Sequence, residues 1–312
     1  MRAVLLAFTD ELRRLKAAGV KTVSVSDESL ETLRRLVAAR QIGIRSTESG
    51  EQTPETGKRE AGAARPPAEP PAHRSPVSGV ADLLPPPPEV VLPAGDKSVR
   101  WQALRELVLN HAVCRAHVRP GKQVVFGVGN LDAKIMLVGE APGAEEEVQG
   151  EPFVGPAGQL LTKMIKTMGL ERGDVYIGNI MNWRPELPLR PDGTQAGNRE
   201  PTPEEMAFCL PFITAQIGVV APAVIVALGA TATRGLLGSH AFRSLGEVRS
   251  RWHDYRGTPL RVTYHPSYLL RKEVEGKAAA NQAKRTAWED FLAVMERAGL
   301  PISEKQRHYF LA

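Results

Sequence analysis

Cysteine is nearly absent from this chain, with Cys114 and Cys209 as the only two among 312 residues. A disulfide framework is therefore excluded, and free thiols are the expected state in a reducing compartment. Long apolar runs are also missing, because no stretch reaches the roughly 18 residues that cross a bilayer. The opening segment MRAVLLAFTDELRRLKAAG mixes both charges among its apolar residues, which a secretory signal does not do. We therefore expect a cytoplasmic protein with no membrane partner.

Acidic residues are outnumbered by basic ones. The chain has 40 Lys and Arg against 35 Asp and Glu, a net charge of +5 and an isoelectric point of about 9.3. This balance fits a polyanionic partner, but many basic proteins bind nothing acidic, so it carries little weight alone.

Large apolar residues are sparse in residues 44–97, where Pro, Ala, Glu, Ser and Gly dominate. Such a stretch cannot bury enough surface to offset its ordering entropy, and this predicts a Pro-rich disordered linker. It divides a small helical N-terminal segment, residues 1–43, from a folded domain, residues 98–312. A docking site for a partner protein within the N-terminal part is the alternative to a plain tether.

The folded domain alternates strand-like and helical patterns. The expected strands are 135–138, 175–180, 224–228 and 260–264, and the expected helices are 101–112, 158–168, 203–219, 231–237 and 278–298. Strand–helix alternation with continuously apolar strands predicts a parallel sheet covered on both faces. Ligands of such sheets collect beyond the carboxyl ends of the strands.

The residues that follow each expected strand are therefore the candidates for a site. Two segments rich in Gly and Pro follow the first strand and contain Phe153, which is either a core plug or a platform for a planar ring. Asn179 ends the second strand, where its amide either caps a loop or reads the edge of a pyrimidine. His265 follows the last strand and is either structural or catalytic. Leu269 and Leu270 come next and are typical of a core.

Several blocks in fixed order carry a resemblance that spans Val99 to Val294. They are VFGVGN (125–130), GEAPGAEEE (139–147), GEPFVGPAGQLL (150–161), GNIMNWRP (178–185), GNREPTPEE (197–205), VIVALG (224–229) and YHPSYLLR (264–271). The chain resembles the uracil-DNA glycosylase superfamily, and most of all its family 4, the iron–sulfur type. The resemblance implies a three-layer α/β/α sandwich with a central four-stranded, mostly parallel sheet. It also implies a monomer that flips uracil from single- or double-stranded DNA and hydrolyses the N-glycosidic bond in base excision repair.

The resemblance assigns roles around the flipped base. Phe153 would stack on uracil, and Asn179 would bond its Watson–Crick edge and reject cytosine. Backbone amides near Ala141 and the side chain of His265 would contact O2. Glu140 would help to place the attacking water.

Further positions concern the loop and the DNA. Glu146 would brace the loop and crowd the C5 side of uracil. The expected DNA contacts are Ser267, Leu269, Leu270 and Arg271. Among these, the two leucines are candidates for the wedge that fills the vacated stack, and Arg271 would bind a phosphate.

The sequence departs from family 4 at the [4Fe–4S] ligands. His111 stands at the first cysteine position and Trp183 at the third, so that only Cys114 and Cys209 remain. Two cysteines cannot hold the usual four-thiolate cluster, and we expect it to be lost. His111, Cys114 and Cys209 offer three ligands for another metal such as zinc, one fewer than a structural zinc site uses.

A second departure is the segment ELPLRPDGTQA (186–196), which is longer than the family's usual link. A relative within the superfamily carries a histidine in a basic insert that traps the sugar covalently. This segment contains no histidine, so we expect ordinary turnover. Three other readings stay open: a glycosylase for hypoxanthine or xanthine, a non-catalytic DNA-binding homologue, and a phage-polymerase-linked domain without uracil excision.

Overall fold

The computed structural model describes residues 84–238 and 240–311. The expected N-terminal helical segment (1–43) and most of the expected linker (44–97) lie outside the described residues.

The last part of the expected linker belongs to the folded body. Leu84, Val90 and Leu92 pack against the core, although the chain there is extended rather than helical. Asp96 then caps helix α3 (Lys97–Asn110) by accepting a hydrogen bond from the backbone N–H of Val99 at 2.9 Å. The folded domain therefore begins before residue 98, the start predicted from the sequence. Although the segment is rich in proline, its three apolar residues pack it against the core.

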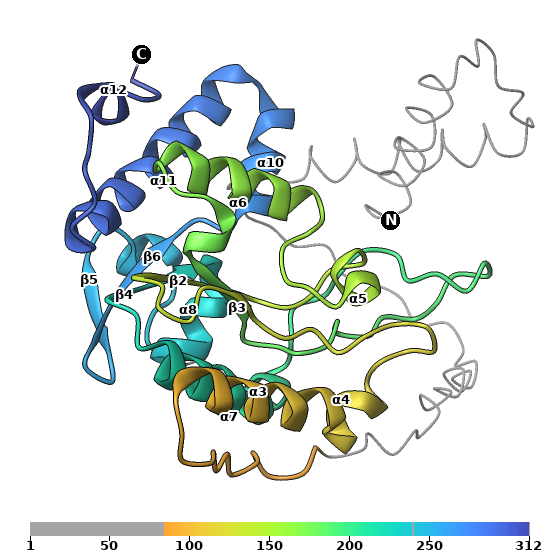
Figure 1. The fold of residues 1–312 in the computed structure, drawn as a ribbon. Coiled ribbons are helices and arrows are strands. Elements are labelled where there is room, and N and C mark those ends of the chain that lie inside the picture. The colour runs from red at the N-terminus through yellow and green to blue at the C-terminus, as the bar shows by residue number, and fades with distance from the viewer. Residues whose placement is uncertain (1–83, 239, 312) are drawn as a thin grey trace, which may run out of the picture. The chain divides into compact units, whose positions relative to one another are not determined.

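The sheet has six strands in the order β1-β3-β2-β4-β6-β5 (Figure 1). Their bounds are β1 (Val128–Gly129), β2 (Ile135–Gly139), β3 (Tyr176–Asn179), β4 (Val224–Leu228), β5 (Trp252–Tyr255) and β6 (Thr258–Thr263). β3, β2, β4 and β6 are parallel, and β1 and β5 pair antiparallel at the two edges. The expected four-stranded parallel core is confirmed, and two short edge strands extend it.

Helices cover both faces of this sheet, as the sequence pattern predicts. The α-helices that follow α3 in the described part of the chain are α4 (Ala112–Ala116), α5 (Glu146–Gln149), α6 (Pro156–Thr167), α7 (Pro203–Val220), α8 (Gly229–Leu237), α9 (Leu245–Val248), α10 (Pro266–Glu275), α11 (Lys277–Arg297) and α12 (Glu304–Arg307). Along β2, Met136 and Val138 join the core with α3, α7 and α8, whereas Ile135 and Leu137 join the core with α6 and α11. The alternation makes three layers, with α6 and α11 on one side and α3 and α7 on the other (Figure 1).

The carboxyl ends of the parallel strands meet at one edge of the sheet. β2 ends at Gly139 and β3 at Asn179, and these two residues are register partners. A cavity of about 820 Å³ opens at this edge. Each helix within residues 84–238 and 240–311 is too short or too polar to span a lipid bilayer.

Candidate active site

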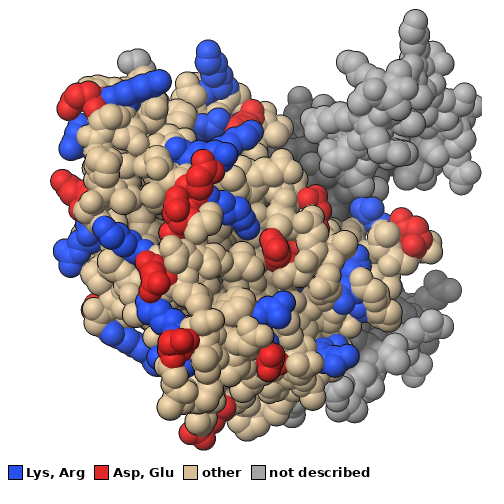
Figure 2. All heavy atoms as spheres, in the orientation of Figure 1, with Lys and Arg blue, Asp and Glu red and all other residues tan. Residues whose placement is uncertain are grey.

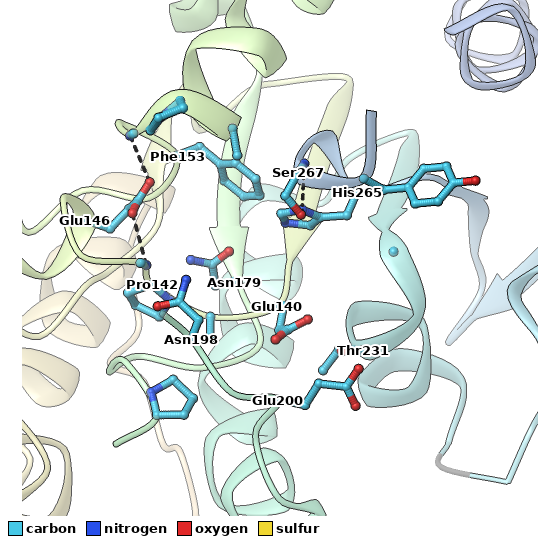
Figure 3. Close-up of a pocket in the computed structure, with 18 of the residues that line it drawn as sticks. Glu140, Pro142, Glu146, Phe153, Asn179, Asn198, Glu200, Thr231, His265 and Ser267 are labelled. Atoms are coloured by element: carbon cyan, nitrogen blue, oxygen red, sulfur yellow. Dashed lines mark hydrogen bonds between the residues drawn. The ribbon is translucent and has the colours of Figure 1, made fainter. Parts of the chain in front are cut away.

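The cavity gathers the residues that follow β2, β3, β4 and β6. Its lining includes most positions singled out in the sequence: Glu140, Ala141, Glu146, Phe153, Asn179, His265, Ser267 and Arg271. Figure 3 shows Phe153, Asn179 and His265 around one space, with Glu140 below them. Asn179 and His265 are far apart in sequence, and the parallel topology brings them together, whereas Phe153 reaches the cavity from the loop between α5 and α6.

Glu146 joins the two Gly- and Pro-rich segments that form one wall. Its carboxylate accepts hydrogen bonds of 3.0 Å from the backbone N–H groups of Gly143, Val154 and Gly155 (Figure 3). Charge-assisted bonds of this kind are stronger than neutral ones, so a single buried carboxylate fixes the loop on both of its sides. This geometry matches the bracing role implied by the resemblance.

Phe153 is held in an unusual backbone conformation. Its φ is 55°, in the left-handed region, and only 6% of the residue is exposed. A Cβ on Gly158 would lie 1.8 Å from the Phe153 carbonyl oxygen, and a Cβ on Gly139 would lie 2.4 Å from its ring. Backbone strain of this kind persists where the surrounding structure holds the residue in place. Here Gly139 and Gly158 leave the space that Phe153 occupies, because a side chain on either would collide with it. The result is a ring fixed at the cavity wall.

Asn179 is 6% exposed, and its side-chain oxygen finds no hydrogen-bond partner among the described residues. Leaving a buried polar atom unpaired costs about 1–3 kcal/mol. Figure 3 shows the amide directed into the cavity below Phe153. The unpaired amide is therefore available to a ligand with a polar edge.

His265 is the N-cap of α10, and its ring geometry fixes its tautomer. Nδ1 accepts a hydrogen bond from the backbone N–H of Ser267 at 3.2 Å and lies 2.8 Å from the Ser267 hydroxyl. Burial, and then the charge of Arg271, lowers the pKa of His265 to about 4. A neutral imidazole whose Nδ1 accepts must carry its proton on Nε2. The residue therefore offers the cavity a neutral N–H donor.

Glu140 follows β2 and faces a mixed electrostatic environment. Burial raises the pKa of its carboxyl group, a hydrogen bond with Thr231 lowers it, and the negative charge of Glu200 raises it again. Arg234 and Arg271 act in the lowering direction. The net shift is upward, which makes Glu140 a stronger base than an exposed glutamate.

The structure corrects one of the two wedge candidates. Leu269 is 2% exposed and packs against Ala283 and Ala287 of α11. It cannot enter DNA without leaving this core, because the α10 helix turns it towards α11. Leu270 is half-buried and Arg271 is exposed on the same helix. Leu270 is thus the remaining wedge candidate.

Several cavity residues were missed in the sequence. They are Asn198, Glu200, Thr231, Tyr264 and Tyr268. Thr231 and Tyr264 lie just beyond the ends of β4 and β6, so strand-end placement could have identified them. Asn198 and Glu200 follow no strand, and only the tertiary fold carries them to the cavity.

The residues expected at the family's cluster positions form a packed core. Cys114, Trp183 and Cys209 are fully buried, and the ring of His111 lies edge-on to Phe208 at 5.4 Å. Burial raises the pKa of Cys114 to about 12 and that of Cys209 well above its usual value. Within the described ranges, no three His, Cys, Asp or Glu side chains gather as metal ligands. With an imidazole and an indole at two of the four positions, the two thiols alone do not fit a four-thiolate cluster.

Residues 186–196, expected to be longer than the corresponding link of the family, form a small hairpin. Leu189 bridges Gln195, and the N–H of Arg190 bonds the carbonyl of Thr194 at 2.8 Å. The side chain of Gln195 holds the base by donating to the carbonyl of Pro185 at 3.0 Å. The hairpin is exposed beyond the cavity rim, on which Pro185 lies.

Comparison with known proteins agrees with this arrangement. The family model of the uracil DNA glycosylase superfamily matches residues 126–292. The type-4 uracil-DNA glycosylase of Thermotoga maritima is 41% identical over 190 residues, which are 61% of this chain and 90% of the relative. That of Pyrobaculum aerophilum is 41% identical over 178 residues, 55% of this chain and 85% of the relative. That of Archaeoglobus fulgidus is 40% identical over 152 residues, 47% of this chain and 71% of the relative. Motifs, topology and these relatives agree, and the chain belongs to the uracil DNA glycosylase superfamily as a type-4-like member.

Proposed function

We propose that this protein is a uracil-DNA glycosylase of base excision repair, which extrudes uracil from DNA and hydrolyses its N-glycosidic bond. One observation carries the proposal: Phe153, Asn179 and His265 converge on a single cavity from three separate segments. An aromatic face, an unpaired amide and an N–H donor together suit a flat base with polar edges. Extrusion costs a few kcal/mol, and aromatic stacking of about 1–3 kcal/mol offsets part of that cost.

The chemistry follows from these groups. When the bond between C1′ and N1 breaks, its electron pair stays with uracil, and positive charge develops on the sugar. The Nε2–H of His265 and backbone amides near Ala141 stabilise negative charge on O2, and one such donor is worth about 3–4 kcal/mol in other enzymes. Glu140 accepts a proton from water, whose oxygen bonds C1′. Uracil leaves as an anion that takes its proton from solvent, and an abasic site remains.

The test uses the full chain on single-stranded and duplex oligonucleotides that carry uracil, hypoxanthine or xanthine. Alkali cleavage after incubation reports abasic sites, and unmodified strands serve as controls. We expect strand breaks at uracil with repeated turnover. Failure to cleave any uracil-containing strand would reject the proposal, and cleavage at hypoxanthine or xanthine alone would redirect it to another base.

Leu270 supports base extrusion in this proposal, and its contribution depends on the substrate. Leu270→Ala should slow excision from duplex DNA about tenfold and from single strands much less, because only a duplex leaves a stacked gap to fill. Single-turnover rates on both substrates measure this. Leu269→Ala is the matched control: it should lower the free energy of unfolding by about 2–5 kcal/mol and leave the ratio of the two rates unchanged. Equal loss on both substrates in Leu270→Ala would remove the wedge assignment.

We also infer that the family's iron–sulfur cluster has been replaced by aromatic packing. Trp183 supports this, because its ring is fully buried at a ligand position and stacks on His117 with centroids 4.7 Å apart. Protein purified without oxygen should contain far less than one iron per chain by metal analysis and should show no absorption near 400 nm. A stoichiometric cluster would contradict the inference and would require ligands other than the two thiols.

A further inference from the structure

Glu200 is a cavity residue to which the sequence motifs assign no role. It stands between Arg199 and the buried Pro201, just before the N-cap of α7. Arg199 forms two bonds of 2.7 Å to Glu205 and donates at 3.0 Å to the Glu200 carbonyl. Thr202 and Glu205 form a capping box, so the backbone on both sides of Glu200 is fixed.

The Glu200 side chain, by contrast, has no fixed partner. Its residue is exposed at the cavity rim, and within residues 84–238 and 240–311 its carboxylate takes part in none of the hydrogen bonds or ion pairs. The neighbouring Arg199 is already paired with Glu205. Figure 3 shows the Glu140 and Glu200 carboxylates on either side of Thr231, away from Phe153. The unpaired carboxylate of Glu200 thus lies on the same side of the cavity as the half-buried carboxylate of Glu140.

This inference rests on the proposed function, in which uracil gains negative charge and the sugar gains positive charge. The groups that serve the uracil side are N–H donors. The groups that remain for the sugar and the attacking water are the carboxylates of Glu140 and Glu200. We propose that Glu200 is a positioning residue that acts through Glu140, strengthening it as the acceptor of the water proton by charge repulsion.

The groups around Glu140 support this assignment. Arg234 of α8 and Arg271 of α10 both lower the pKa of Glu140, as does the hydrogen bond from Thr231. Burial raises that pKa, and Glu200 is the charged residue that reinforces the effect. Without Glu200, two arginines would face Glu140 with no opposing charge, and the base would weaken.

The negative charge of Glu200 also weakens DNA binding in this proposal. The cavity rim is where the DNA backbone approaches, and a carboxylate there repels phosphates. Figure 2 shows Lys and Arg interspersed with Asp and Glu on the face it presents. Removing the Glu200 charge should therefore weaken catalysis and tighten binding at once. A residue with a purely structural role would not produce these opposite effects.

The experiment compares Glu200→Gln with Glu204→Gln in the full chain. Glu204 is exposed in the first turn of α7 and does not line the cavity, so its variant removes the same charge nearby. We expect Glu200→Gln to lower kcat on uracil-containing single strands about three- to tenfold. Its Kd for an oligonucleotide with a tetrahydrofuran abasic analogue should fall about two- to threefold. The acidic limb of its pH–rate profile should move to lower pH, and Glu200→Asp should restore most of kcat.

The outcomes separate this inference from the proposed function. If wild-type protein excises no uracil, the proposed function fails and the inference fails with it. If wild-type protein is active and Glu200→Gln matches Glu204→Gln in kcat, Kd and pH profile, only the inference is overturned. A fall in kcat with weaker binding would also overturn it, because Glu200 would then assist DNA binding rather than oppose it.

Discussion

Asn179→Ala should lower kcat/KM for uracil excision by about 10²-fold, because it removes two hydrogen bonds to the base, each worth about 1.5 kcal/mol in a desolvated site. The amide is buried at the end of β3 and lacks a partner for its oxygen among the described residues, so its loss costs the folded protein little. Single-turnover rates at subsaturating enzyme measure this effect on kcat/KM, and rates at saturating enzyme isolate the chemical step. A melting temperature close to that of wild type would show that the fold is intact.

The control is Asn182, a second buried asparagine three residues further along the chain. Its side-chain N–H donates to the carbonyl of Val125 at 3.0 Å, and it does not line the cavity. Asn182→Ala should therefore reduce stability while the folded fraction retains its excision rate. If both variants lost activity in proportion to their stability, Asn179 would have no special role in recognition.

His265→Asn should lower kcat about 10²- to 10³-fold, the usual effect of removing one preorganised donor from an anion site. Asparagine is a good N-cap, so its side-chain oxygen can still accept from the N–H of Ser267 and preserve the start of α10. The variant therefore removes Nε2–H but keeps the helix. A kcat within a few fold of wild type, with α10 intact by hydrogen exchange, would exclude His265 from the chemistry.

The same variant tests the protonation state of His265. Its pKa in the folded protein is about 4, below the ordinary value of 6.5, because the ring is buried and lies near Arg271. The unfolded chain then binds the extra proton first, so stability from the neutral ring is complete above pH 6.5 and is lost as pH falls towards 4. Over that range, wild type should lose about 3 kcal/mol more than His265→Asn in denaturant unfolding. If the free energies of unfolding of the two proteins changed in parallel with pH, the ring of His265 would not be buried as a neutral group.

The parallel core and much of the cavity were predictable from the sequence. Continuous apolar runs identify β2, β3 and β4, and parallel strands bring their carboxyl ends to one edge. Asn179 and His265 could be located in this way, since both lie at strand ends. The spacing of Gly and Pro around Phe153 could not predict its positive φ, which depends on the contact with Gly158.

Other features depend on tertiary contacts that local patterns do not encode. Strand β1 has two residues, too few for any periodic signal. In β5 (Trp252–Tyr255) two adjacent polar residues lie between two aromatic ones, without the alternation that indicates a half-buried strand. Leu269 and Leu270 are identical in type, and only the packing of α10 on α11 separates the buried one from the accessible one. Glu200 follows no strand and reaches the cavity through the turn that precedes α7.

The extended segment before α3 decides where the catalytic body begins. Leu84, Val90 and Leu92 cover part of the apolar layer that contains Leu104 and Val108 of α3. A shortened chain that starts at α3 would lack these three residues. The apolar layer that they cover would then be exposed to water, which favours self-association. The smallest unit suited to expression or crystallisation therefore includes Leu84 and the residues that lead from it to α3.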